Sequence, residues 1–175
     1  MKKIILFVFL ACPIGLTAQF QNSGIRMESG DFVEKRLPDK PAFREAMAEL
    51  DYPEGVVPKI VEIDMNGDGH PECWIQGPPD ACGTGGCPCI IMDGKTGRRI
   101  GSVFGSPFFV SDLKINGCAV IHAYAHAGAG SGTVSVWVFD GKAYVLVSRI
   151  DLEGASVDKL FSGFNRFRRL NRETP

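Results

Sequence analysis

The chain lacks a surplus of either charge. Its 175 residues include 19 Lys and Arg against 20 Asp and Glu, which gives a formal net charge of −1. A protein that binds nucleic acid through its phosphates needs an excess of cations over the sequence as a whole. The near-neutral composition therefore excludes a general nucleic-acid binder.

Long apolar runs are also scarce. Residues 4–16 form an uncharged apolar segment that is too short for a membrane-spanning helix of roughly 20 residues. This segment follows Lys2-Lys3 and precedes the small residue Ala18, which is the pattern of a secretory signal peptide. We therefore expect residues 1–18 to be a signal peptide, the protein to be exported (periplasmic or secreted), and the mature form to have no membrane span. A second interpretation makes Cys12 a lipid anchor, because the residues before it loosely resemble a bacterial lipobox.

Cleavage after Ala18 changes what remains to be explained. Loss of Lys2 and Lys3 takes the net charge from −1 to −3, and loss of Cys12 leaves an odd number of cysteines, which are Cys73, Cys82, Cys87, Cys89 and Cys118. An oxidising compartment favours disulfides. With an odd number, at least one thiol stays free or pairs outside the chain.

Common catalytic signatures are absent from the sequence. We find no phosphate-binding loop, no dinucleotide-binding fingerprint and no Ser/His/Asp order, and we assign no catalytic residue. The segment around Ser131 fails the Gly-x-Ser-x-Gly pattern because Ala129 and Thr133 stand at the glycine positions. His122 and His126 lie too far apart on an extended strand to share a metal, so neither receives a role. Paired carboxylates need not be close in sequence, and a hydrolase with scattered acids stays open as an alternative.

The pattern of apolar residues predicts one β-rich domain behind a short helix. Residues 19–38 are polar and without a clear period, so we expect an irregular segment. Asp39 and Pro41 have the positions of a helix cap and a first turn, and apolar residues follow at helical spacing. From Val56 onward, short β-branched and aromatic runs alternate with turns rich in Gly and Asp.

The clearest hairpin is expected in the last third of the chain. Residues 133–139 and 143–147 flank Asp140-Gly141, a pair that tolerates the positive φ angles of a tight turn. We therefore predict an α+β fold that is mainly β, with a short N-terminal helix followed by antiparallel hairpins or a meander. Residues 39–175 would form this single domain.

The strongest chemical signal is the segment Asp64-Met65-Asn66-Gly67-Asp68-Gly69-His70-Pro71-Glu72. Asp64, Asn66 and Asp68 stand at alternate positions with short oxygen-bearing side chains, and Glu72 adds a carboxylate at the ninth. Ca²⁺ prefers several such oxygens, and a glycine at position six permits the necessary turn. The twelfth position, a glutamate in EF-hands, is here Ile75, which argues against a helix–loop–helix site.

This pattern with strands on both sides resembles the calcium loops of FG-GAP/VCBS-type repeat proteins. The resemblance covers roughly residues 58–77 and implies a β-hairpin whose loop, 64–72, binds one structural Ca²⁺. The implied ligands are Asp64, Asn66, Asp68, the carbonyl of His70, and Glu72. A plain turn rich in Asx residues is the alternative.

The second feature is the cysteine cluster Cys82-Gly83-Thr84-Gly85-Gly86-Cys87-Pro88-Cys89. The three glycines make the intervening loop flexible enough for Cys82 and Cys87 to meet, and we predict a disulfide between them. The pairing of Cys73, Cys89 and Cys118 stays open. The cluster also approaches an iron–sulfur spacing, and a thiol redox role is a further alternative. With the acidic loop, it resembles bacterial exported proteins that carry both features, and that resemblance implies no activity.

These observations favour an exported, calcium-stabilised, disulfide-containing β-domain that acts as a binding or structural module. Its partner would be an envelope or extracellular protein, or a polymer. The two alternatives are the hydrolase with scattered acids and the thiol-based redox or metal protein.

Overall fold

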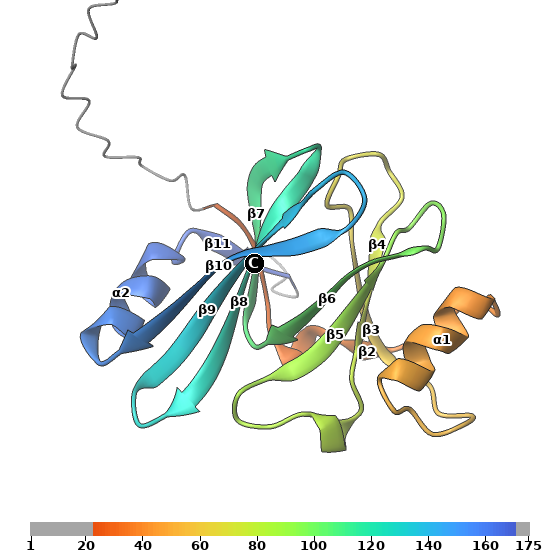
Figure 1. Ribbon diagram of the computed structural model, residues 1–175, viewed down its shortest axis with the longest axis horizontal. Coiled ribbons are helices and arrows are strands. Elements are labelled where there is room, and N and C mark those ends of the chain that lie inside the picture. The colour runs from red at the N-terminus through yellow and green to blue at the C-terminus, as the bar shows by residue number, and fades with distance from the viewer. Residues whose placement is uncertain (1–22, 171–175) are drawn as a thin grey trace, which may run out of the picture.

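The computed structural model describes residues 23–170 and shows a mainly β protein built from two sheets and two helices. The predicted signal peptide and Cys12 lie outside the described residues. Figure 1 shows the two sheets facing each other, with helix α1 at one side of the molecule and helix α2 at the other. No helix among residues 23–170 is long and apolar enough to cross a membrane.

The larger sheet has six strands in the order β10–β9–β8–β7–β1–β11. All neighbouring strands are antiparallel except β1 and β11, which run parallel. The bounds of its strands are β1 Gly24–Met27, β7 Phe108–Ile115, β8 Cys118–Gly128, β9 Ser131–Phe139, β10 Tyr144–Glu153 and β11 Phe167–Arg169.

The smaller sheet has five antiparallel strands in the order β2–β3–β4–β5–β6. Their bounds are β2 Val33–Glu34, β3 Lys59–Ile63, β4 Glu72–Gln76, β5 Cys87–Met92 and β6 Arg99–Gly105. Every residue of the central strand β4 is buried, because this strand is covered on both faces.

The expected irregular segment at 19–38 contains two short strands. β1 lies at its start, β2 near its end, and a 3₁₀ turn, Ser29–Asp31, joins them. Met27 is fully buried in the core between the sheets. Strands this short show too few alternations for the sequence pattern to reveal them.

Helices α1 (Pro41–Glu49) and α2 (Ala155–Gly163) cover the outer faces of the sheets. The expected cap Asp39 is not the N-cap of α1. That position belongs to Lys40, and Asp39 forms an ion pair with Arg44 instead. α1 packs Phe43 and Ala46 against the outer face of the smaller sheet.

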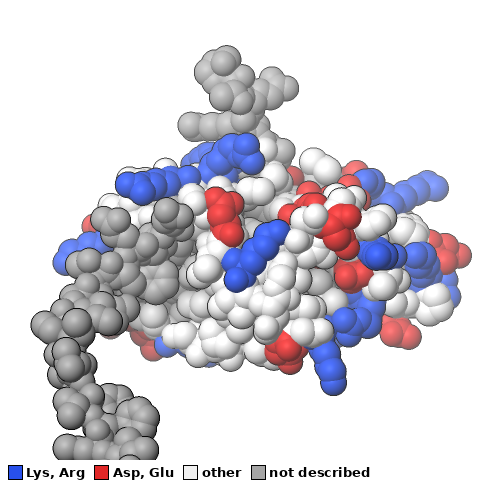
Figure 2. All heavy atoms as spheres, turned by 90° about the horizontal axis from the view of Figure 1, so that it is seen from above, with Lys and Arg blue, Asp and Glu red and all other residues white. Residues whose placement is uncertain are grey.

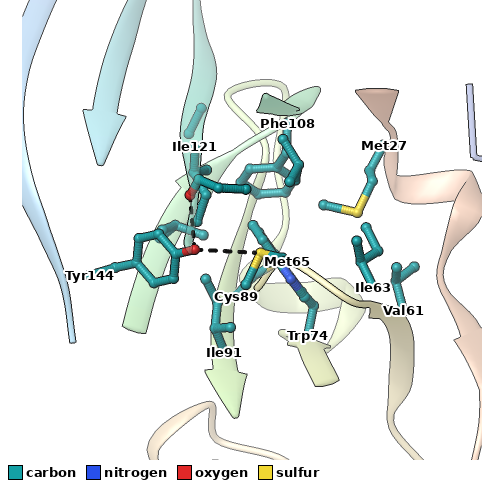
Figure 3. Close-up of a cluster of buried hydrophobic side chains, with 14 of the residues drawn as sticks. Met27, Val61, Ile63, Met65, Trp74, Cys89, Ile91, Phe108, Ile121 and Tyr144 are labelled. Carbon is teal, nitrogen blue, oxygen red and sulfur yellow. Dashed lines mark hydrogen bonds between the residues drawn. The ribbon is translucent and has the colours of Figure 1, made fainter. Parts of the chain in front are cut away.

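The core between the sheets is apolar and contains one polar link. Figure 3 shows Trp74, Phe108, Ile121 and Met65 converging there, with the Tyr144 ring beside them. The Tyr144 hydroxyl donates to the carbonyl of Ala119 (2.9 Å) and lies 3.8 Å from the sulfur of Met65. Burial raises the pKa of Tyr144, so the phenol stays a neutral donor.

A second core lies under α2 and encloses a histidine. His122 of β8 is paired in register with Phe109 of β7, and its ring lies 5.2 Å from that of Phe164. Its Nδ1 is buried and has no hydrogen-bond partner among the described residues. Burial lowers the pKa of His122 from its ordinary value of 6.5. The neutral imidazole is therefore the form that this aromatic environment favours.

We expect His122 to make the protein less stable in acid. Because its pKa is lower folded than unfolded, the unfolded chain binds more protons as the pH falls below about 6.5, and stability drops. His122→Phe should reduce this loss between pH 7.5 and pH 5, as measured by urea unfolding at each pH. The exposed-histidine control, His126→Gln, should retain the parent's pH dependence.

Candidate functional site

The acidic loop joins the two most regular strands of the smaller sheet. β3 and β4 pair antiparallel, and the last pair before the loop is Ile63 with Glu72. The loop is therefore the tip of a β-hairpin. Gly67 and Gly69 have φ angles of 84° and 81°, which side chains rarely adopt, so both positions depend on glycine.

Backbone N–H groups hold the short polar side chains of the loop. Asp64 accepts from Gly67 N through Oδ1 (2.7 Å) and from Gly69 N through Oδ2 (3.0 Å). These two bonds are the main reason that the pKa of Asp64 is lowered. Asn66 Oδ1 accepts from Asp68 N, and Asp68 Oδ1 accepts from His70 N. Hydrogen bonds to the backbone of the loop thus fix the direction of each of these side chains.

Glu72 differs from these three because it is buried, with 1% of its surface exposed. Its Oε2 accepts from Met65 N (2.7 Å) and its Oε1 from Asn66 Nδ2 (3.1 Å). Burial raises the pKa of Glu72, and the negative charges of Asp64 and Asp68 raise it further. A buried carboxylate near two others is the least favourable charge of the loop, and a cation would relieve it.

The loop is anchored to the core by its second residue. Met65 is 1% exposed, and its carbonyl accepts from Ala119 N of β8 in the other sheet (3.0 Å). With the Tyr144 contact at its sulfur, Met65 fixes the hairpin tip against the larger sheet (Figure 3). A conformational change in the loop would therefore alter the contacts of Met65 with β8 and Tyr144 between the two sheets.

Lys114 of β7 contacts the loop, and no local feature of the sequence predicts this contact. Its Nζ donates to the backbone carbonyl of Asn66 (2.8 Å), and a Cβ on Gly67 would come within 2.9 Å of the same atom. The ammonium contributes to the lowered pKa of Asp64. The two residues lie 48 positions apart in sequence, so only the packing of the sheets brings them together.

The calcium site implied by the resemblance stays a prediction. Asn66 and Glu72 are in direct contact, but no three His, Cys, Asp or Glu side chains within residues 23–170 lie close enough together to hold a metal. The His70 carbonyl oxygen faces Gly94 on the β5–β6 connection, where an added Cβ would come within 2.4 Å of it. The donor chemistry nevertheless suits Ca²⁺, because all the expected ligand atoms are oxygens.

A disulfide joins Cys82 and Cys87, as predicted from the sequence. Between them Gly83 and Gly86 exchange two backbone hydrogen bonds, which close a tight turn. The bridge fixes the connection that enters β5.

The other described cysteines are free, buried thiols, and none is paired with another. Cys73 lies under α1, whereas Cys89 and Cys118 face the core between the sheets. Burial raises the pKa of Cys73 to about 12 and that of Cys89 still further. Because the thiolate is the reactive form, this burial argues against a redox role for Cys89.

On the face seen in Figure 2, acidic and basic side chains are interspersed, so no large patch of one charge forms there. One hollow beside α1 is lined by two carboxylates, Glu62 and Asp93. Glu62 forms an ion pair with Lys35 (2.5 Å). Asp93 caps a turn, because its Oδ1 accepts from the backbone N–H of Thr96. Both acids therefore already have structural partners.

Comparison of the chain with models of protein families, with curated proteins and with solved structures gave no match.

Proposed function

We propose that this protein is an exported β-domain whose hairpin loop 64–72 binds one structural Ca²⁺. The observation that supports this proposal most directly is the buried carboxylate of Glu72 at the base of a loop that also holds Asp64 and Asp68. The proposed ligands are Asp64, Asn66, Asp68, Glu72 and the His70 carbonyl. The proposed resemblance to FG-GAP/VCBS loops agrees with the position of this loop between two antiparallel strands.

The charge balance of the loop favours a cation. Asp64, Asp68 and Glu72 place three carboxylates within nine residues, and Lys114 is the only cation that donates a hydrogen bond to the loop in the described structure. A divalent ion would offset the remaining repulsion. Backbone N–H groups already order Asp64 and Asp68, so ligand binding loses less conformational entropy than it would in a free loop.

The role we infer for the ion is to fix the hairpin tip. Met65 links the loop to β8, so a filled loop would stiffen the contact between the sheets. We infer no catalytic activity. The domain would present its surface to an envelope or extracellular protein or to a polymer, in the periplasm or outside the cell. Export rests on the signal-like residues 1–18, with lipid attachment at Cys12 as the second interpretation.

Calcium should raise the thermal stability of the parent protein and not that of loop variants. A ligand that binds only the folded state at one hundred times its Kd stabilises by about 2.7 kcal/mol. We therefore expect millimolar Ca²⁺ to raise the melting temperature of the parent protein. Asp64→Ala and Asp68→Ala should abolish most of this rise. Differential scanning calorimetry with added Ca²⁺ or chelator measures the effect.

Asp140→Ala is the matched control for these variants. Asp140 also caps a turn, because its Oδ1 accepts from the backbone of Lys142 and Ala143, but it lies in the β9–β10 hairpin. This variant should lose some stability and keep the full calcium response. Equal melting temperatures of the parent with Ca²⁺ and with chelator would contradict the proposal.

Lys114 should weaken calcium binding, since its ammonium lies beside the loop. Lys114→Met removes the charge and keeps most of the apolar stem. We expect affinity for Ca²⁺ to rise about two- to five-fold, in keeping with the usual size of partly exposed charge interactions. Isothermal titration calorimetry measures the change. Lys159→Met, on α2, should leave the affinity as in the parent, and an unchanged affinity in Lys114→Met would show that this ammonium does not oppose the ion.

A further inference from the structure

The two sheets have four edge strands, and they differ in how open they are. β2 has two residues and β11 has three, which offers little backbone for pairing. β6 contacts strands β8 and β10 of the other sheet. β10 has ten residues and pairs only with β9, so its outer edge carries the longest unpaired backbone among residues 23–170.

β10 also exposes apolar side chains. Val147 is 54% exposed and Ile150 is 50% exposed. A bulge at Val147 interrupts the pairing with β9, but from Ser148 to Glu153 the register is regular. An open edge strand with exposed apolar residues is a template for a further strand. β6 and α2 contact β10, but within residues 23–170 no strand pairs with the outer edge of its regular part.

The charges on the regular part of β10 are self-complementary. Arg149 and Asp151 flank Ile150 on either side. When two copies of a strand pair antiparallel about a two-fold axis, residues at equal distance from the axis face each other. An axis at Ile150 therefore sets Arg149 of each copy opposite Asp151 of the other, and sets the two Ile150 side chains together.

We propose that β10 is a self-association edge, on which a second copy of this chain pairs antiparallel about Ile150 and joins the two larger sheets. Arg149 makes no ion pair within the described residues and has its guanidinium available. Asp151 accepts from Thr133 through Oδ1 (2.7 Å), which leaves its second oxygen for the arginine of the second copy.

The alternative registers match the sequence less well. An axis at Val147 sets the apolar Val145 opposite Arg149 and runs through the bulge. An axis at Leu152 places Asp151 opposite Glu153, which are like charges, and like charges directly opposite each other destabilise a sheet. The centre at Ile150 joins opposite charges on both sides of the axis.

A charge swap tests the register through the oligomeric state. Arg149→Asp places two aspartates opposite each other, and Asp151→Arg places two arginines opposite each other. We expect each single variant to raise the dimer dissociation constant at least about ten-fold, because two cross-strand pairs become repulsive. The double variant Arg149→Asp/Asp151→Arg restores opposite charges and should regain most of the affinity. Sedimentation velocity over a concentration series gives these constants.

An engineered cysteine at the axis gives a second measurement that does not depend on charge. Residues facing each other across antiparallel strands have Cα atoms about 4.5–5.5 Å apart, within the about 4.4–6.8 Å that a disulfide spans. Ile150→Cys should therefore cross-link two copies under mild oxidation, whereas Val147→Cys, which faces Glu153, should cross-link poorly. The parent protein, whose described free thiols are all buried, reports any cross-linking that does not need the new cysteine.

Three outcomes would overturn the proposal. A parent protein that stays monomeric at about millimolar concentration would exclude the second copy as occupant. A double variant with a dimer dissociation constant as high as that of either single variant would exclude the pairing of Arg149 with Asp151. Cross-linking at Val147→Cys equal to that at Ile150→Cys would exclude the axis at Ile150.

Discussion

Replacement of Trp74 by alanine is expected to lower the free energy of unfolding by about 4 kcal/mol, enough to unfold a substantial fraction of a marginally stable domain. Trp74 is fully buried on the central strand β4, and its ring packs 5.4 Å from that of Phe108 in the other sheet. The truncation leaves a cavity between two sheets that cannot collapse without moving their strands. Urea unfolding at neutral pH measures the loss.

Trp74→Phe separates the volume of the side chain from its polar atom. The indole Nε1 of Trp74 is buried and has no hydrogen-bond acceptor among the described residues. Phenylalanine removes this unsatisfied donor while it retains most of the packing, so we expect a loss of only about 1 kcal/mol. Trp137→Ala is the control, because Trp137 is only partly buried at the margin of the same core. A loss there equal to that of Trp74→Ala would contradict the importance of complete burial.

The hairpins were predictable because their signals are local. Asp140-Gly141 lies between two runs of strand-forming residues, and the structure places a turn there with Asp140 bound to the backbone of the two residues that follow Gly141. The disulfide between Cys82 and Cys87 was predictable for the same reason, since three glycines permit the turn that brings the sulfurs together. The strands on both sides of the acidic loop, each five residues long, are likewise indicated by their own apolar residues.

The order of the strands was not predictable from such signals. β1 lies between β7 and β11, which are separated from it by about eighty and about one hundred and forty residues. Nothing in Gly24–Met27 specifies those partners, because the choice depends on which faces of two complete sheets are left apolar. The position of helix α2 was not predictable for a similar reason, because it depends on the packing of Phe161 against Phe109 of the larger sheet.

Some features of the candidate site were likewise predictable from the local sequence, whereas others depend on tertiary packing. The ligand types and their spacing were visible in the sequence, because one loop carries them all. The burial of Glu72 and the approach of Lys114 were not visible, since both arise from the packing of β7 and β8 over the hairpin tip. These two features set the electrostatics of the loop. A ligand pattern alone therefore predicts the chemistry of a site better than its affinity.

The loop also depends on a glycine outside its own motif, and Gly94→Ala should show this. A Cβ at Gly94 would lie 2.1 Å from the carbonyl oxygen of Pro71 and 2.4 Å from that of His70. Both atoms belong to the backbone, so the contact cannot be relieved by a side-chain rotation, and the loop exit must move away from the β5–β6 connection. We expect a loss of about 3 kcal/mol in the free energy of unfolding, measured by urea denaturation. If the His70 carbonyl is a calcium ligand, the same variant should also show a smaller rise in melting temperature with Ca²⁺.

Gly30→Ala is the matched control: no atom lies within 4 Å of its added Cβ, and stability should stay within about 0.5 kcal/mol of the parent. Equal stability of the two variants would mean that the β5–β6 connection yields freely, and that the exit of the acidic loop is not held by Gly94.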